Sequence, residues 1–362
     1  MHSNERNLIF DHFSFQTILK AIFYFGLKYF LRVYNRIYFR SIKIYGLKNI
    51  PKDGGVLYSP NHQGAFLDPL LIGSMTPGRV TSLTRSDVFG GPLQWFLDAL
   101  QMLPIYRIRN GYSNLKKNDE IFDQCYDLLG NGKNLMMFSE GGHHNEYYLQ
   151  RLSKGSSRLV FQAHQKYPQQ KIYIQPVGIN YGHHQQARCS LHLVFGEAIE
   201  VGQFINSQLS DPENINALRD QLQERMEDCL WLPDNGEHYA LQKDRINRIT
   251  TQMDFYSLKS SLHSHWEKLP KRREIEFLKK LMAFCLLIPS FPPMLTCRWV
   301  IGKFEDIVFI SSLKYAFGAF LFPLWWLISG SIIAAYFSLP IALTFIGVSM
   351  LFLLMRSFLL LK

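Results

Sequence analysis

A long stretch near the C-terminus carries no charge, and it constrains the fold more than any other feature of the sequence. Between Lys314 and Arg356 the chain contains no Asp, Glu, Lys or Arg. Because a transmembrane helix needs about 20 predominantly apolar residues, we expect two spans, at about residues 315–337 and 338–355, that form a hairpin. The preceding region 277–301 is also apolar, but it contains three prolines, which break a regular helix. It is a candidate for a short span, a re-entrant segment or an interfacial helix.

The N-terminal residues predict an amphipathic helix. Within residues 13–40 the basic side chains recur at multiples of four, so they share a slowly drifting helix face, and aromatic and aliphatic residues lie between them. These basic residues are Lys20, Lys28, Arg32, Arg36 and Arg40. A basic face against an apolar body is typical of a helix in the membrane interface, so we expect residues 1–44 to be membrane-associated. The alternative is a helix that packs on the protein's own core, with its basic residues in solvent.

The middle of the chain, residues 45–232, alternates short apolar runs with helical patterns. This alternation predicts an α/β fold with a mixed, largely parallel sheet that is flanked by helices. The expected strands are 42–45, 55–59, 80–83, 135–138, 172–177 and 191–195, and the expected helices include 114–130, 151–167 and 212–230.

A polar segment, residues 233–276, separates this region from the apolar C-terminal region 277–362. Its helical spacing over 241–264 predicts a helical connector. Its basic end consists of Lys268, Lys271, Arg272 and Arg273. Because basic residues that flank membrane segments stay on the cytoplasmic side, we expect an integral membrane protein whose α/β domain faces the cytoplasm.

A histidine and an aspartate stand six positions apart, just after the apolar run 56–58. A histidine needs a partner that holds its tautomer and raises its basicity before it can take a proton from a hydroxyl. Asp68, across a turn and the start of a helix, can be that partner for His62. The alternative is a histidine that caps a helix starting near Ala65, with Asp68 in the first turn.

Further segments contain groups that suit an anionic substrate. Arg107 and Arg109 alternate on an extended segment and point to the same side, where two guanidinium groups can hold a phosphate or carboxylate, unless they are solvated arginines at a sheet edge. Gly141 follows a strand and lets the backbone approach an anion. Glu140 can accept a hydrogen bond from a substrate hydroxyl, or it can order Arg107. Lys154 opens a helix that can bind a second anion.

Charge and composition narrow the partners. The net charge of +10 indicates an anionic partner: membrane phospholipid, a phosphorylated substrate or nucleic acid. Lys and Arg are not clustered with interleaved aromatics as in nucleic-acid readers, so we expect no nucleic acid. The five cysteines show no CxxC spacing, and the adjacent His143 and His144 are poorly placed to chelate one ion. We therefore expect no metal site.

Four blocks of the sequence together resemble the motifs of the glycerolipid acyltransferase superfamily. They are a histidine–aspartate motif at 61–69, an arginine-bearing block at 104–111, an F-P-E-G-type block at 138–144 and a proline-bearing strand at 174–181. The resemblance covers roughly residues 45–200 and is closest to the glycerol-3-phosphate and dihydroxyacetone-phosphate acyltransferase branch.

The chain departs from that pattern at two positions. Five residues, not the usual four, separate His62 from Asp68, and Leu67 takes the usual place of the aspartate. Ser139 replaces the usual proline of the third block, which puts the rigidity of that loop in doubt. A one-residue bulge or an extra half-turn would bring the carboxylate back to the imidazole.

The resemblance implies an O-acyltransferase of phospholipid biosynthesis that needs no cofactor or metal. The donor would be an acyl-CoA or acyl-carrier-protein thioester, and the acceptor a glycerol phosphate, first of all glycerol 3-phosphate. His62 would be the general base and Asp68 would orient it, while Arg107, with Glu140 and Gly141, would hold the acceptor phosphate. The alternatives are a 1-acylglycerol-3-phosphate or other lyso-lipid acyltransferase, and a non-catalytic lipid-binding membrane protein of the same type.

Overall fold

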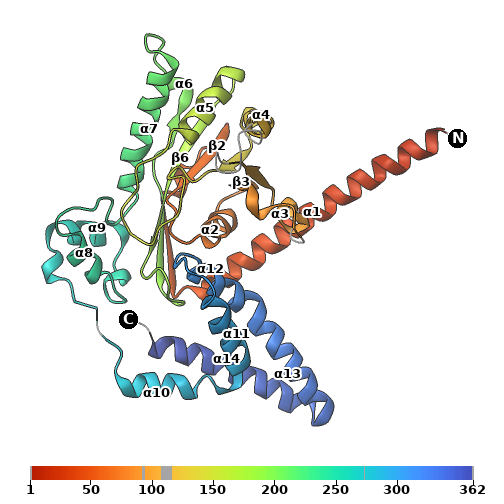
Figure 1. Ribbon diagram of the computed structural model, residues 1–362, viewed down its shortest axis with the longest axis vertical. Coiled ribbons are helices and arrows are strands. Elements are labelled where there is room, and N and C mark those ends of the chain that lie inside the picture. The colour runs from red at the N-terminus through yellow and green to blue at the C-terminus, as the bar shows by residue number, and fades with distance from the viewer. Residues whose placement is uncertain (1, 92–93, 107–115, 273, 361–362) are drawn as a thin grey trace.

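The computed structural model describes residues 2–91, 94–106, 116–272 and 274–360. Within these ranges eight strands form one sheet in the order β1-β7-β6-β2-β5-β3-β4, and β8 pairs with β6. Figure 1 shows helices on both faces of this sheet and the C-terminal helices gathered at one end of the molecule. The strands are β1 (Ser41–Tyr45), β2 (Gly55–Pro60), β3 (Val80–Arg85), β4 (Met102–Ile105), β5 (Asn134–Met136), β6 (Ile172–Tyr181), β7 (Ser190–Phe195) and β8 (Ile199–Glu200).

The expected mixed, largely parallel sheet is confirmed. All neighbouring strands pair in parallel except β6 with β7 and β6 with β8, which are antiparallel. The sequence did not indicate β4 as a strand, and it contains Pro104. This proline is tolerated because, among the described strands, β4 is the last in the order and pairs only with β3, so one of its edges needs no N–H donors.

The helices of the α/β domain and its connector follow the chain between and after these strands. They are α1 (His2–Tyr38), α2 (Leu67–Met75), α3 (Gln94–Ala99), α4 (Lys116–Gly130), α5 (Gly155–Lys166), α6 (Val201–Phe204), α7 (Asp211–Asp228), α8 (Tyr239–Arg245) and α9 (Phe255–Ser264). The last two belong to the segment that was expected to be a helical connector, and they pack on a buried cluster around Trp231.

Alternate residues of the central strands face two separate apolar cores. Leu57 of β2 lies between Leu135 of β5 and Ile174 of β6, and all three are 0% exposed in a core that α4, α5 and α7 complete. The flanking Val56 and Tyr58 point the other way, into a core formed with α1 and α2. Because side chains alternate across a strand, a fully apolar strand marks a sheet that is covered on both faces.

Helix α1 packs on the domain along one stripe and exposes apolar residues on the other. Its inward stripe includes two polar residues, Lys28 and Asn35, which are 8% and 0% exposed. The ammonium of Lys28 donates to the carbonyl of Thr76 at 2.8 Å, and the Arg32 guanidinium donates to the carbonyl of Ser74 at 2.9 Å. Lys28 and Arg32 therefore do not belong to an outward basic face, in contrast to the expectation from the sequence. The outward side instead carries apolar residues, namely Ile18, Ile22, Tyr29, Val33 and Ile37.

The C-terminal region contains two helices that are long and apolar enough to cross a membrane. Phe309–Tyr336 has 28 residues and Leu339–Leu359 has 21, and both lie mostly on the outside of the protein. These are the two spans expected near 315–337 and 338–355. The first is built from α12 (Phe309–Ala316), a five-residue π-helical segment and α13 (Phe322–Tyr336), and the second is α14 (Leu339–Leu359).

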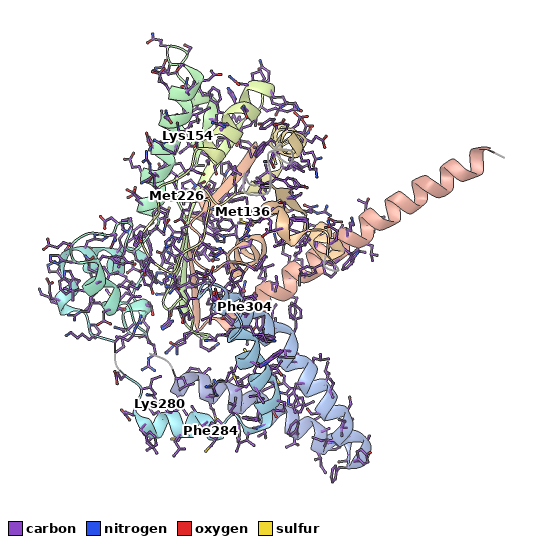
Figure 2. All side chains as sticks on the ribbon, viewed as in Figure 1. Met136, Lys154, Met226, Lys280, Phe284 and Phe304 are labelled. Atoms are coloured by element: carbon purple, nitrogen blue, oxygen red, sulfur yellow. The ribbon has the colours of Figure 1, made fainter. Side chains whose placement is uncertain are left out.

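The first span begins six residues earlier than the sequence indicated, because α12 packs on the α/β domain. Before it, α10 (Phe277–Cys285) and α11 (Phe291–Ile301) form a bent pair with an angle of 59° between Phe277–Cys285 and Ile288–Ile301. Two prolines fall in the first turn of α11, where a helix has no internal bond to lose. Figure 2 places Lys280 and Phe284 of α10 at the outer edge of the molecule.

Candidate active site

The candidate site lies where β2 ends and α2 begins. In a parallel sheet the loops that follow the strands gather at one edge, which is where α/β proteins bind ligands. His62 follows the last residue of β2, Pro60, by two positions, and Asp68 lies in the first turn of α2. Phe138 and Glu140 follow β5, the parallel neighbour of β2.

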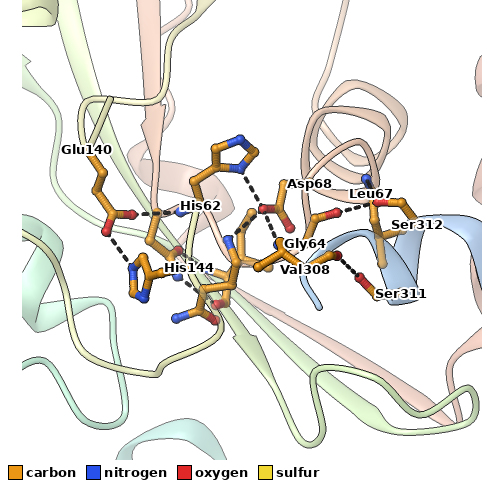
Figure 3. A network of polar contacts seen from close by, with 12 residues as sticks. His62, Gly64, Leu67, Asp68, Glu140, His144, Val308, Ser311 and Ser312 are labelled. Atoms are coloured by element: carbon orange, nitrogen blue, oxygen red, sulfur yellow. Dashed lines mark hydrogen bonds and ion pairs between the residues drawn. The ribbon is translucent and has the colours of Figure 1, made fainter. Parts of the chain in front are cut away.

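His62 and Asp68 are hydrogen-bonded to each other. The imidazole Nδ1 lies 2.9 Å from Oδ2 of Asp68 (Figure 3), and the two side chains are 16% and 0% exposed. The same oxygen accepts from the backbone N–H groups of Gln63 at 2.8 Å and Gly64 at 2.7 Å, and Oδ1 accepts from the Tyr181 hydroxyl at 2.7 Å. A buried carboxylate is stable when donors surround it, and here four donors hold Asp68 in one orientation.

The backbone between the two residues absorbs the fifth intervening position. Ala65 has a positive φ of 44°, in the left-handed region, and the N–H of Leu67 donates to the carbonyl of Gly64 at 2.8 Å to close the turn. This turn brings Asp68 back to the imidazole. Gly64 has no room for a side chain, since a Cβ there would lie 2.7 Å from Oδ1 of Asp68. The longer spacing is therefore compatible with the pair.

The rest of the His62 ring is held by aromatic contacts and is partly open to solvent. It stacks on Phe138 with ring centroids 3.9 Å apart, and the ring of His143 meets it edge-on at 5.4 Å. Because Nδ1–H donates to Asp68, Nε2 carries the lone pair, and Figure 3 shows it pointing away from the carboxylate. No hydrogen-bonding group in the described parts of the chain occupies Nε2. This nitrogen is available to a hydroxyl from outside.

The side chain of Glu140 is 1% exposed and is used inside the protein. Its Oε1 accepts from the N–H of His62 at 2.7 Å, and its Oε2 contacts Nε2 of His144 at 2.7 Å and the N–H of Gln150 at 3.0 Å. These contacts tie the loop after β5 to the loop that carries His62. They support a positioning role for Glu140, and its contact with a substrate stays a prediction.

A chain of hydroxyls takes the place of the missing proline in the third block. Ser139 is buried, and its Oγ lies 2.5 Å from Oγ of Ser59 and 2.6 Å from Oγ of Ser156. Its carbonyl accepts from both the N–H and the hydroxyl of Ser153, at 2.8 and 2.9 Å. The loop is thus fixed by hydrogen bonds at the point where the resemblance left its rigidity in doubt.

The predicted anion-binding residues are either exposed or outside the described part of the chain. Arg107 and Arg109 lie outside the described residues. Gly141 is exposed with a φ of 73°, a conformation that glycine adopts without strain. Lys154 is exposed at the start of α5 (Figure 2), and none of the described side chains pairs with its ammonium. A role of these residues in binding the acceptor stays a prediction.

Sequence reasoning missed three side chains that contact the site. Tyr181 ends β6, and the fourth block in which it lies was noted only as a proline-bearing strand. Burial and the nearby Asp68 carboxylate raise the pKa of its phenol well above the ordinary value, so it remains a donor. Asp306 and Ser312 come from the C-terminal region, and nothing in their local sequence connects them to the site. The tyrosine had a signal, since it is the one titratable group of its block.

Among the described residues, no group of three or more His, Cys, Asp or Glu side chains is arranged to hold a metal ion. The chemistry available at this edge of the sheet is that of a buried, oriented carboxylate, an imidazole with an open nitrogen, and backbone N–H groups in the neighbouring loops. Such a set can remove a proton from a hydroxyl and so create a nucleophile.

Known proteins resemble this chain in three kinds of comparison. Residues 41–180 match the family model described as Acyltransferase. Among curated proteins, glycerol-3-phosphate O-acyltransferase 1 from Saccharomyces cerevisiae is 26% identical over 103 residues, which span 28% of this chain and only 14% of that protein. Among solved structures, the crystal structure of the 1-acyl-sn-glycerophosphate (LPA) acyltransferase from Thermotoga maritima matches with a TM-score of 0.42 and 16% identity, over 58% of this chain and 80% of that chain.

Proposed function

We propose that the chain, whose residues 41–180 match the Acyltransferase family model, moves a fatty acyl group from an acyl thioester to a hydroxyl of a glycerol-phosphate acceptor. Glycerol 3-phosphate is the acceptor we propose. The thioester is carried by coenzyme A or by an acyl carrier protein, and the product enters phospholipid biosynthesis.

One observation carries the proposal: the hydrogen bond between His62 and Asp68, with Nε2 of His62 open to the outside. A histidine that merely caps a helix would not need a buried carboxylate with four donors behind it. The bonded carboxylate fixes the tautomer in which Nε2 is the base, and it stabilises the imidazolium once the proton has moved.

The proposed reaction uses the substrate's own hydroxyl as the nucleophile. Nε2 of His62 takes the hydroxyl proton while the oxygen attacks the thioester carbonyl, which gives a tetrahedral intermediate. The intermediate collapses, the carbon–sulfur bond breaks, and the thiolate takes the proton from His62 as it leaves. The products are the ester and the free thiol, and no acyl-enzyme forms. General-base assistance of this kind contributes on the order of 10²–10⁴ in rate.

Binding of the acceptor phosphate is proposed for Arg107 and Arg109, with the backbone near Gly141 and with Lys154 as a second cation. Guanidinium groups bind phosphate oxygens in pairs, and a net charge of +10 favours an anionic acceptor and an anionic membrane surface. The basic end of the connector before residue 277 supports a cytoplasmic location of the α/β domain.

The test is an acyl-transfer assay with the purified full chain in lipid vesicles. A labelled acyl-CoA and a labelled acyl carrier protein are each supplied with glycerol 3-phosphate, dihydroxyacetone phosphate or lysophosphatidate. We expect ester formation on glycerol 3-phosphate, and we expect His62→Ala to remove it while membrane association stays intact. The exposed His265 offers a matched control, because His265→Ala removes an imidazole far from this site in the sequence and should keep full turnover.

Each outcome decides between candidates. Transfer to lysophosphatidate alone would replace glycerol 3-phosphate by the second acceptor class. Absence of transfer to all three acceptors from both donors would overturn the proposed activity and favour a non-catalytic lipid-binding protein. Unchanged turnover in His62→Ala would leave the activity standing and remove its mechanism.

A further inference from the structure

The first helix of the C-terminal hairpin contacts the catalytic turn directly. Ser312 of α12 is buried, and its Oγ donates to the carbonyl of Gly64 at 2.6 Å and accepts from the N–H of Leu67 at 3.0 Å (Figure 3). These partners are 248 and 245 residues away along the chain. They lie on either side of Ala65, the residue whose φ is positive.

The hydroxyl supplies what the start of α2 lacks. The first N–H groups of a helix have no partner inside it, and an N-cap side chain usually accepts from one of them. The N-cap of α2 is Phe66, which makes no such bond, and the acidic residue of the first turn, Asp68, is used by His62 and the turn. Ser312 therefore helps to satisfy the start of α2 from another part of the chain.

A second contact joins the same part of the hairpin to the neighbouring loop. Nε2 of His143 lies 2.7 Å from Oδ2 of Asp306, three residues before α12. The His143 ring also meets Phe309 of α12 edge-on at 5.3 Å, and it meets His62 at 5.4 Å on another side. Residues 306–316, which we call the hairpin base, thus touch both loops that frame the candidate base.

Helix α1 also forms hydrogen bonds to the hairpin base. The Tyr315 hydroxyl donates to Oδ1 of Asn35 at 2.5 Å, and the Tyr38 hydroxyl donates to the carbonyl of Ser311 at 3.4 Å. Both tyrosines and Asn35 are buried. The position of Ser312 relative to the catalytic turn is therefore fixed by bonds that do not involve the turn itself.

We propose that Ser312 is a positioning residue for acyl transfer, through which the hairpin base holds the Gly64–Leu67 turn and, with it, the orientation of Asp68 toward His62. This inference rests on the proposed function. Loss of the hydroxyl leaves a carbonyl and an N–H with one partner fewer around a strained residue, so the turn can relax and the carboxylate can rotate. A misplacement of about 1 Å can lower a rate by as much as about 10².

The experiment compares two neighbouring serines in the full-length protein. Ser312→Ala removes the hydroxyl that spans to the turn. Ser311→Ala is the matched control, because Ser311 is also buried but its Oγ donates to the carbonyl of Val308, next to its own helix. Ser312→Thr retains a hydroxyl at the same place and serves as the conservative variant.

We expect Ser312→Ala to lower kcat about tenfold, with the KM for the thioester unchanged. We also expect faster amide hydrogen exchange in peptides that cover residues 61–69. Ser312→Thr should recover most of kcat and of the protection, and Ser311→Ala should resemble wild type in both measurements. Thermal unfolding of each variant shows whether a loss of activity comes from unfolding of the whole protein.

Wild-type kcat and wild-type exchange in Ser312→Ala would overturn the inference, as would an equal loss in Ser311→Ala. The exchange measurement needs no substrate. If wild type transfers no acyl group at all, the proposed function fails, and the protection of residues 61–69 still decides whether Ser312 holds the turn.

Discussion

The α/β domain and the C-terminal hairpin use the same apolar residue types in opposite ways. In the sheet, Leu57 and Leu135 are 0% exposed, whereas Leu327 of α13 is 65% exposed and Tyr336 at its end is 83% exposed. The domain removes its apolar surface from water by packing sheet against helices. The hairpin leaves its surface outward, which is stable only where lipid takes the place of water. Composition alone does not separate these cases; the length of the uninterrupted apolar run does.

The hairpin base reverses this pattern. Its Ser311, Ser312 and Tyr315 are buried, while apolar neighbours further along the same helix face outward. The hydroxyl groups of Ser312 and Tyr315 bond to a backbone carbonyl of the domain and an amide oxygen of α1, in addition to the apolar core that Tyr315 shares with them. Directional bonds fix an orientation more closely than apolar contacts do. The junction of the domain and the hairpin, formed by the hairpin base, contacts the catalytic turn.

The largest effect should come from the buried polar centre of the domain. Asp68→Asn places an amide among four donors, so the tautomer and orientation of His62 are lost, and we expect acyl transfer to fall by about 10⁴ as in other histidine–carboxylate pairs. Turnover assays with the proposed substrates measure this. The exposed Asp220 provides a control, since Asp220→Asn should leave turnover unchanged. Near wild-type activity in Asp68→Asn would remove the carboxylate from the mechanism.

A matched pair of leucines tests the contrast between the two regions directly. Leu135→Ala opens a cavity in the closed core beside α4 and should lower the free energy of unfolding by about 2–5 kcal/mol. Leu327→Ala exchanges one lipid-facing group for another and should change it by about 0.5 kcal/mol or less. Unfolding of both variants in the same vesicles gives the comparison, and equal effects would mean that α13 packs inside the protein after all.

The junction should show an intermediate effect. Tyr315→Phe removes the hydroxyl that donates to Asn35 and leaves a buried amide oxygen without that donor, which costs about 1–3 kcal/mol. We expect a lower thermal midpoint and faster amide exchange in the hairpin base. Tyr29 on the exposed side of α1 is the control, because Tyr29→Phe should alter neither. No change in Tyr315→Phe would show that apolar contacts alone dock the hairpin.

The smallest effect concerns the contact between His143 and Asp306 at low pH. Burial raises the pKa of the Asp306 carboxyl, but the Val308 N–H and the His143 side chain outweigh it, and the net pKa lies below the ordinary value. Such a group stabilises the folded state above its unfolded pKa of about 3.9 and loses that contribution as the pH falls through the folded value.

The carboxyl of Asp306 is 46% exposed, so this contribution should be small. We expect wild type to exceed Asp306→Asn slightly in thermal midpoint at pH 5, and the difference to shrink toward pH 3. A difference that grows with acidity would show that the contact opposes folding.

Features with a local pattern could be predicted from the sequence. Short apolar runs indicated most strands of the sheet, and the long uncharged stretch indicated both long C-terminal helices. The spacing around His62 indicated its partner. The edge strand β4 was missed because it is only four residues long and contains Pro104. The inward position of Lys28 could not be predicted, because the carbonyls that accept its ammonium lie 48 and 50 residues further along the chain.

The sequence predicted the part of the candidate site in which both partners lie in one motif. The His62–Asp68 pair needed only a turn, and the positive φ of Ala65 provides it. Ser312 and Asp306 could not be found in this way, since their partners are set by how α12 docks on α2, and single-sequence patterns contain no information on contacts across more than 160 residues.

The first C-terminal helix is longer than the hydrocarbon layer of a bilayer is thick. At about 1.5 Å per residue, its 28 residues reach about 42 Å, whereas the hydrocarbon layer of a bilayer is about 30 Å thick. The helix is thus about 12 Å longer than the hydrocarbon layer, and its first turns, which include Ser312, are packed on the α/β domain. Because the helix starts on the α/β domain, this excess length allows the proposed acyl transfer to take place at the level of the phospholipid headgroups, where a water-soluble acceptor and a lipid-soluble acyl chain can meet.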